Sequence, residues 1–298
     1  MQWVEIVGMT EFESVTDVED VADRHVPGIG KINIHRSRQG LVNQTYRVLR
    51  DGKAYALRVA AANPHELGLD RHWEARVLES AVATGLAPAL VYCDPERGIL
   101  VSRWVDGRSW GAEDTLRPVN LSRMAELLHR IHALGLPMPA RVMTPGQWMG
   151  YYSAAAPPTG RAAALRIMAV ERLRELAALP EAEPVVCHSD LHTLNLIDRG
   201  GSLVLLDWEY AHAADPFWDL AGWSANNDFE DGPRSELLAK YLARTPTSEE
   251  RRRLRLSGWL YDYVCLLWSE LYLSRHDARP EEVTARAQLL AARLQASK

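Results

Sequence analysis

The stretch 185-VVCHSDLHTLNLIDRGGSLVLLDWEY-210 places acids and amides directly beside runs of apolar residues. Within it, Asp190 and Asn195 belong to the pattern H-x-D-x-x-x-x-N, and Asp207 ends an apolar run further along. A solvated loop does not need apolar flanks, and a plain core does not accept unpaired acids. We therefore interpret these residues as the polar centre of a site that buried strands hold in place.

The chemistry that suits this pattern is phosphoryl transfer. In-line transfer of a γ-phosphoryl group needs positioning and cations that neutralise phosphate charge, with little covalent help. Magnesium prefers oxygen ligands, usually one or two carboxylates together with phosphates and water. Asn195 and Asp207 would supply such oxygens, and Asp190 would orient the attacking hydroxyl or accept its proton.

Other interpretations of this stretch fit the pattern less well. The same acids and amide could be surface caps and turn formers, but the combined spacing disfavours that. His188 is interpreted as a hydrogen-bonded anchor of the loop. His192 could join His188 in a metal site, but the spacing fits no common zinc cage.

Alternating apolar residues predict the strands that would carry the site. Segments 31–37, 43–50 and 54–60 alternate and are separated by turn signals, which predicts an antiparallel meander. Segment 88–105 predicts two further strands around a tight turn.

Helical spacing dominates elsewhere in the chain. It predicts helices at 12–25, 66–85, 120–135 and 161–179, and helical structure from 233 to the end. A Pro- and Ala-rich piece at 153–160 predicts a loop. The most apolar segment, 256–273, contains two acids, so we interpret it as a buried helix and not as a membrane span.

Bulk properties exclude several classes of function. The chain has 298 residues and a net charge of -5, which gives no basic footprint for nucleic acid and no polybasic membrane patch. Three scattered cysteines predict reduced thiols and no disulfide framework. The first twenty residues do not have the pattern of a signal peptide, so we expect a cytoplasmic protein.

With these elements in place, the chain resembles the aminoglycoside phosphotransferase and choline kinase superfamily, which shares the protein-kinase-like fold. The matching phrases are HSDLHTLN at 188–195, LLDWEYA at 205–211, DPFWDLA at 215–221, 40-GLVNQTYRV-48, 55-YALRVA-60 and 69-LDRHWEARVL-78. The resemblance covers about residues 35–275. The motifs DWEYA and DPFWDLA are more similar to those of bacterial choline kinase-like and thiamine kinase-like members than to those of the antibiotic-modifying members.

The resemblance implies a two-lobed α+β fold with ATP and Mg²⁺ as cofactors. Residues 1–105 would form a small nucleotide-binding lobe built on an antiparallel sheet, and residues 106–298 a larger, mostly helical catalytic and acceptor-binding lobe. Asp190 matches the catalytic acid, and Asn195 and Asp207 match the magnesium ligands.

The resemblance also assigns residues to the nucleotide. These are Gly40, Asn43, Thr45, Arg58, Glu74, Ser102 and Trp104. The first three belong to the loop that covers the phosphates, and backbone groups from Ser102 to Trp104 would meet adenine. Glu74 matches the helix acid that pairs with the phosphate-binding base. That base is Arg58 here, where the wider superfamily has Lys. Arg presents a planar fork where Lys presents a point charge.

Asp219 resembles a structural acid that braces the catalytic loop. Two of the nucleotide assignments have plainer alternatives. Arg58 and Glu74 could form an ordinary surface pair, and the loop could be a simple hairpin turn.

The acceptor is predicted from a late cluster of aromatic and acidic residues. Aromatic faces beside a carboxylate suit a quaternary ammonium or thiazolium cation. The candidate contacts are Glu209, Trp223, Asp228 and Trp268. The alternative for any one of these aromatic residues is a place in the core. Because the chain also resembles choline kinase-like and thiamine kinase-like members, we expect a small cationic acceptor such as choline, ethanolamine or thiamine. We expect the protein to be a monomer or homodimer. The alternatives are an aminoglycoside or other antibiotic acceptor, and a non-catalytic nucleotide-binding protein of the same fold.

Overall fold

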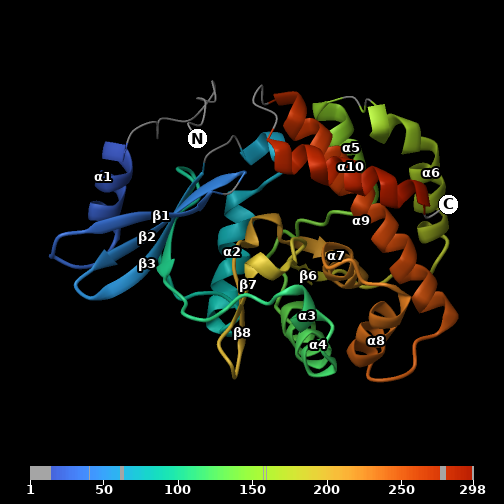
Figure 1. Ribbon diagram of the computed structural model, residues 1–298, viewed down its shortest axis with the longest axis horizontal. Coiled ribbons are helices and arrows are strands. Elements are labelled where there is room, and N and C mark those ends of the chain that lie inside the picture. Colours follow the sequence, from blue (N-terminus) through green and yellow to red (C-terminus); the bar gives the residue numbers. More distant parts are fainter. Residues whose placement is uncertain are drawn as a thin grey trace. The chain divides into compact units, whose positions relative to one another are not determined.

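A computed structural model describes the chain at residues 15–39, 41–60, 64–156, 158, 160–275 and 280–296. The chain divides into two compact units (Figure 1). The first comprises Met1–Arg108 and Ile197–Tyr210, and the second comprises Ser109–Leu196 and Ala211–Lys298. The sequence predicts one boundary near residue 105, whereas in the structure the segment Ile197–Tyr210 also belongs to the first unit.

The first unit contains a five-stranded sheet of order β1-β2-β3-β5-β4. Its strands are β1 (Asn33–Gln39), β2 (Asn43–Arg50), β3 (Lys53–Ala60), β4 (Leu90–Asp94) and β5 (Ile99–Arg103). All four pairings are antiparallel. Asp51 and Gly52 join β2 to β3 with φ values of 50° and 71°. Two positive φ values are what a tight two-residue hairpin requires, so the predicted meander is confirmed.

One face of this sheet packs on helix α1 (Val15–His25), the described part of the helix predicted at 12–25. Tyr55, Leu57 and Val59 of β3 lie in that core with Val21 of the helix. Figure 1 shows α1 beside β1, β2 and β3. Because side chains alternate along a strand, Arg58 points to the opposite face.

Helix α2 (Arg71–Ala83) supplies the residues that face Arg58. It starts later than the predicted residue 66, because Gly68 adopts a φ of 75° and Asp70 caps the helix by accepting the Trp73 N–H at 2.9 Å. A short 3-10 turn, η1 (Pro64–Leu67), precedes it.

The returning segment of the first unit is a hairpin followed by a 3-10 turn. Its elements are β7 (Leu196–Asp198), β8 (Leu203–Leu205) and η3 (Trp208–Tyr210). The Leu205 N–H donates to the Leu86 carbonyl at 2.8 Å, and η3 contacts α2. These contacts explain why the segment groups with the first unit.

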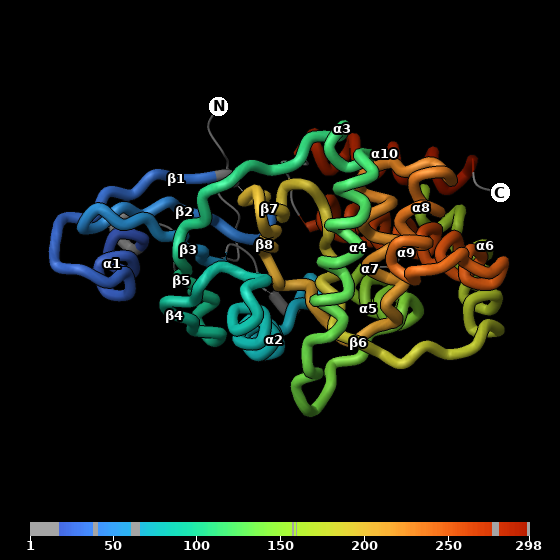
Figure 2. The backbone as a smooth tube through the Cα atoms, turned by 90° about the horizontal axis from the view of Figure 1, so that it is seen from below, coloured from blue at the N-terminus to red at the C-terminus, as the bar shows by residue number. Residues whose placement is uncertain are grey.

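The second unit is mostly helical. A two-stranded sheet of β6 (Val185–Cys187) and β9 (His212–Ala214) flanks the catalytic-loop sequence, which includes the turn η2 (Thr193–Asn195). The helices are α3 (Ala112–Thr115), α4 (Pro118–His132), α5 (Pro145–Ala155), α6 (Gly160–Ala177), α7 (Phe217–Asn226), α8 (Asp231–Leu242), α9 (Ser248–Arg275) and α10 (Glu281–Ala296). Helix α9 contacts α5, α6, α7 and α10, and Figure 2 shows it among them.

The helices predicted for this unit are present, but the structure contains further ones. Helices α3, α5 and α7 were not predicted, and α5 extends to Ala155, into the segment 153–160 that was predicted to be a loop. Thr144 begins α5 with a capping box closed by Gln147. The C-terminal region forms three helices, and Ala243 ends the first of them with a φ of 52°. Within the described residues, no helix has the length and apolar character that crossing a membrane requires.

The core of the first unit gives a stability prediction. Leu57 is fully buried between α1 and the neighbouring strands, so Leu57→Ala should lower the free energy of unfolding by about 2–5 kcal/mol. Urea denaturation measures the change. Lys53→Ala, at an exposed position of the same strand, is the control and should stay within about 0.5 kcal/mol. Equal losses in both variants would contradict the described core.

Candidate active site

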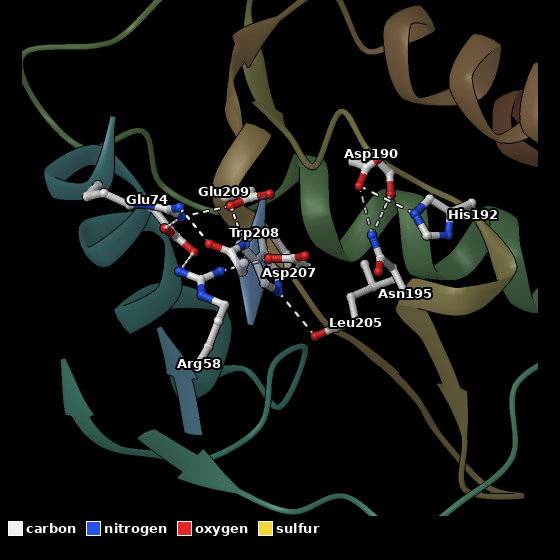
Figure 3. Close-up of polar contacts among 11 residues, drawn as sticks. Arg58, Glu74, Asp190, His192, Asn195, Leu205, Asp207, Trp208 and Glu209 are labelled. Carbon is white, nitrogen blue, oxygen red and sulfur yellow. Dashed lines mark hydrogen bonds and ion pairs between the residues drawn. The ribbon is translucent and has the colours of Figure 1, made fainter. Parts of the chain in front are cut away.

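Arg58 joins two acids of the first unit. Its guanidinium lies 2.6 Å from Glu74 of α2 and 2.7 Å from Asp207, which follows β8 (Figure 3). Burial alone would lower the pKa of Arg58, but the charges of Glu74 and Asp207 raise it above its usual value. Burial would raise the pKa of Glu74, and the nearby Arg58 and Arg71 bring it below its usual value. Both members of the pair are therefore charged.

Asp207 has the left-handed backbone conformation expected of a strained functional position. Its φ is 59°, a region that Asp enters more readily than most residues. Trp208 braces this turn, because its indole N–H donates to the Leu205 carbonyl at 3.2 Å (Figure 3). The carboxylate stays about one-third exposed, at 34%, so it can meet a ligand from solvent.

A second arginine completes the cluster. Arg71 donates to Glu74 at 2.9 Å, to Glu209 at 2.8 Å and to the Asn43 side-chain oxygen at 2.8 Å. The Asn43 amide in turn donates to Glu209 at 2.6 Å. Burial, followed by the negative charge of Asp207, raises the pKa of Glu209 to about 7, and the two arginines oppose this rise.

In the second unit, Asp190 lies beside Asn195 and His192. The Asn195 amide donates to the Asp190 carboxylate at 2.9 Å and to its carbonyl at 3.1 Å (Figure 3). His192 accepts the Leu194 N–H at Nδ1, which leaves Nε2 to face Asp190 at 3.4 Å. Burial would raise the pKa of Asp190, but His192 and His188 bring it below its usual value. The carboxylate is therefore ionised.

Asp219 fixes the backbone before Asp190. It accepts the N–H groups of His188 at 2.8 Å and Ser189 at 2.7 Å, and it lies 3.3 Å from His132. Ser189 has a φ of 67°, so this acid holds the loop in a conformation that most residues avoid. The role expected for Asp219 from the resemblance agrees with these contacts.

Carbonyl groups on either side of Asp190 are also held. Tyr261 of α9 donates to the Ser189 carbonyl at 3.4 Å, and Asn226 of α7 donates to the Leu191 carbonyl at 2.9 Å. Arg286 of α10 donates to the Asn226 side-chain oxygen at 2.7 Å. Through these contacts the loop is fixed by three helices of the second unit.

The chemistry of two of these groups fits magnesium. Asn195 uses its NH₂ group on Asp190, so its carbonyl oxygen remains available. Asp207 accepts from Arg58 with one oxygen and keeps the other, in a cluster of three carboxylates and two guanidinium groups. An excess carboxylate and an oriented amide oxygen are the hard ligands that magnesium takes.

Three of the predicted nucleotide residues, Thr45, Arg58 and Ser102, lie on one face of the sheet. Thr45 lies directly opposite Arg58, and Ser102 lies opposite Ala56 two residues along β3. This is the face away from α1. Trp104 lies just beyond β5, and the Arg47 guanidinium sits over its ring at 5.0 Å. Gly40 lies outside the described residues.

The predicted acceptor contacts have other partners. Trp223 has no exposed surface and meets Trp110 edge to face, so it presents no ring face to a cation. Glu209 belongs to the first unit, where Arg71 and Asn43 bind it. These contacts give both residues structural roles in place of the predicted contact with the acceptor.

The remaining two acceptor predictions stay predictions. Asp228 is exposed and pairs with Arg293 at 2.8 Å. Trp268 is partly exposed and stacks on Tyr272. Neither contact prevents the residue from meeting a ligand.

Sequence reasoning missed three residues that support the predicted ones: Arg71 in the first unit, and Asn226 and Arg286 in the second. Arg71 had a readable signal, because it stands three residues before Glu74 at the start of the same helix. Asn226 and Arg286 had none, since their partners lie on another helix or in the loop. Tyr261 belongs to the late aromatic cluster, but its contact with the Ser189 carbonyl was not predicted.

Comparison with known proteins identifies similar chains. A family model described as "Phosphotransferase enzyme family" matches residues 34–256. A choline/ethanolamine kinase family protein from Mesorhizobium loti is 24% identical with a TM-score of 0.78, and the match covers 94% of each chain. The choline kinase LicA from Streptococcus pneumoniae is 23% identical with a TM-score of 0.78, covering 95% of this chain and 99% of that one.

An antibiotic-modifying enzyme shares the architecture. A spectinomycin phosphotransferase, solved with ADP and spectinomycin, is 12% identical with a TM-score of 0.62, covering 92% of this chain and 93% of that one. At such identities these structures establish a common fold. The predicted kinase-like α+β fold is confirmed.

The brace at Asp219 gives a testable expectation. Asp219→Asn replaces one acceptor oxygen with a donor, which leaves a buried N–H of His188 or Ser189 unpaired and should cost about 1–3 kcal/mol. Urea denaturation measures the loss, and hydrogen exchange of the peptide around residue 189 should become faster. Asp228→Asn removes an exposed ion pair and should cost less than about 1 kcal/mol. Unchanged exchange in Asp219→Asn would contradict the brace.

Proposed function

Since the chain belongs to the phosphotransferase enzyme family, we propose that it transfers the γ-phosphoryl group of ATP to a hydroxyl group of a small molecule. The protein is thus a small-molecule kinase, and the proposal concerns its cofactors, its acceptor and the residues that carry the reaction.

The observation that carries the proposal is the environment of Asp190. Its carboxylate is ionised, accepts the Asn195 amide, and stands in a loop whose N–H and C=O groups are held on both sides. An ionised acid in a fixed position can orient an acceptor hydroxyl and take its proton as the phosphoryl group leaves ATP. A purely structural acid would not need one-third of its side chain exposed, as Asp190 has at 32%.

Asn195 and Asp207 would hold magnesium through the oxygens described above. Bound Mg²⁺ would neutralise charge on the β- and γ-phosphates. Arg58 would contact the same phosphates, with Glu74 fixing its direction. The sheet face with Thr45 and the backbone from Ser102 to Trp104 would receive the rest of the nucleotide.

For the acceptor, we extend the proposal to a small cation that carries a hydroxyl, such as choline, ethanolamine or a thiamine-like molecule. The choline kinase structures match this chain with higher TM-scores than the spectinomycin enzyme does. Two tyrosines, Tyr152 and Tyr261, are close enough to Asp190 for its charge to raise their pKa values further, after burial has raised them. Aromatic rings beside a carboxylate suit an ammonium group.

An antibiotic acceptor is the second candidate, because one of the similar structures holds spectinomycin. Arg286 argues against polycationic antibiotics. Its guanidinium is near enough to Asp190 to help lower that pKa, and its repulsion grows with the charge of the acceptor. A monocation is disfavoured less than an aminoglycoside.

The reaction is tested by ADP release with ATP and magnesium across a panel of acceptors. The panel contains choline, ethanolamine, thiamine, several sugars and several aminoglycosides. Asp190→Asn keeps the size of the side chain and removes the base, so kcat should fall by about 10²–10⁴-fold while ATP still binds. An acceptor that supports equal rates in both proteins would overturn the role of Asp190.

Magnesium dependence is tested by Asp207→Asn. Loss of the carboxylate should raise the magnesium concentration needed for half-maximal nucleotide binding, because a neutral amide is a poorer ligand for a hard cation. Calorimetric titration with a non-hydrolysable ATP analogue at several magnesium concentrations measures this. Asp198→Asn, in the nearby hairpin, is the control and should leave the requirement unchanged. If Asp207→Asn needs the same magnesium concentration as the wild type, Asp207 is not a magnesium ligand.

His192 gives an expectation for pH. Its ring helps to bring the pKa of Asp190 below the usual value, so His192→Gln should move that pKa upward. Activity that needs ionised Asp190 would then be lost at a higher pH as the solution is acidified. The acid limb of the kcat profile measures the shift, and an unmoved or lowered limb would contradict it.

A further inference from the structure

We propose that Arg71 and Glu209 are positioning residues that fix the nucleotide loop and Arg58 in one arrangement for binding the phosphates of ATP. Neither residue would touch the nucleotide. The inference rests on the proposed function, because it concerns how that nucleotide site is set. It is argued from the contacts, burial and charges of one cluster in the first unit.

Arg71 occupies the centre of the cluster. One terminal nitrogen donates to Glu74 and Glu209, and the other donates to Asn43, all within 2.9 Å. Its side chain is 5% exposed, so these bonds exchange little with water. A planar fork is needed to reach acceptors in two directions at once.

Asn43 connects this centre to the nucleotide loop. It belongs to the segment predicted as the nucleotide loop, it is the residue at which β2 begins, and it is 4% exposed. Its NH₂ group is used by Glu209 and its oxygen by Arg71. Both ends of the amide are therefore occupied within the protein. The side chain predicted to bind the nucleotide instead anchors the loop that would do so.

Glu74 connects the same centre to Arg58. One carboxylate oxygen pairs with Arg58 at 2.6 Å and the other with Arg71 at 2.9 Å. Rotation of this carboxylate would break both contacts, so Glu74 couples the direction of Arg58 to that of Arg71. Removing Arg71 would therefore loosen both groups that are proposed to contact the phosphates. It would free the nucleotide loop, which Asn43 anchors, and it would free Arg58, which Glu74 holds.

Glu209 closes the network from the returning segment. It lies two residues after Asp207 and receives both Arg71 and Asn43. With 4% exposure it has no surface for a ligand. Its position makes the loop, the helix and the segment with the magnesium ligand depend on one another.

The test compares two buried arginines of the same unit. Arg71→Lys keeps the charge and loses the fork. The matched control is Arg50→Lys: the Arg50 side chain is 8% exposed and donates to Gly30, Val26 and Asp23, at the other end of β2. Calorimetric titration with a non-hydrolysable ATP analogue and Mg²⁺ gives Kd, and thermal unfolding gives Tm for each protein.

We expect both variants to lose thermal stability, and Arg71→Lys alone to raise the nucleotide Kd, by about 10- to 100-fold. The KM for ATP should rise with it, while the KM for the acceptor stays unchanged. Equal Kd values in the wild type and Arg71→Lys would overturn the inference. An equal rise in Kd for Arg50→Lys would also overturn it, because it would show a general loss of stability.

Two further variants keep the inference testable if Arg71→Lys does not fold. Asn43→Ala leaves every charge paired and should raise Kd in the same direction. Glu209→Gln should also raise Kd. The double variant Asn43→Ala/Glu209→Gln should have a Kd no higher than that of the weaker-binding single variant, because both substitutions break the same Asn43–Glu209 contact. Additive effects would show that the residues do not act as a unit.

The same titration separates the two levels of the argument. A wild-type protein that does not bind the analogue would overturn the proposed function and this inference together. A wild type that binds it normally, with Arg71→Lys and Asn43→Ala unaffected, would overturn the inference alone and leave the phosphotransferase proposal standing.

Discussion

The first unit depends on a group of two arginines and three acids that is buried except for Asp207, which is partly exposed. Removing charges from water costs free energy that is recovered only with good geometry and further hydrogen bonds. Here Arg58 and Arg71 each reach two acids, and Glu74 is shared between them. A shift of any one element would leave a buried charge without its partner. The strand, the helix and the returning segment are therefore held in a single arrangement.

In the second unit, side chains hold the backbone of the loop that carries Asp190. A loop that presents Asp190 cannot be regular structure, so its backbone groups need partners from elsewhere. Asp219 takes two N–H groups, and Tyr261 and Asn226 cover the neighbouring carbonyls. Strained conformations persist only where the surroundings determine them from several sides. Ser189 meets that condition here, and Asp207 meets it separately in the first unit.

The family match and the surroundings of Asp190 cover different parts of the sequence. The family match covers residues 34–256 and includes the residues proposed to act on the phosphates. Helix α10 and most of α9 lie beyond it, yet Arg286 and Tyr261 reach the surroundings of Asp190 from there. The similar solved structures match 94–95% of this chain, so these late helices belong to the shared fold.

The sequence alone predicted the strand meander and the helix that carries Glu74, and the structure contains both. It also indicated Asp190, Asn195 and Asp207 as candidates for phosphoryl transfer. Those features are local: alternation, turn residues and spacing are read within a few neighbours. It also predicted the pairing of Arg58 with Glu74, through a resemblance. Only the tertiary structure decided that the segment with Asp207 belongs to the first unit, because that depends on contacts with α2 and Leu86.

Tertiary structure also determines which of the predicted acceptor residues are exposed enough to contact a ligand. Glu209 and Trp223 resemble an acceptor pocket in sequence, but one is bound by Arg71 and the other is fully buried. Composition and spacing report the kind of side chain and not its partners. The part played by Arg286 was invisible for the same reason: it reaches the loop of Asp190 through Asn226, which donates to the Leu191 carbonyl, and such contacts between residues far apart in sequence exist only in the folded chain.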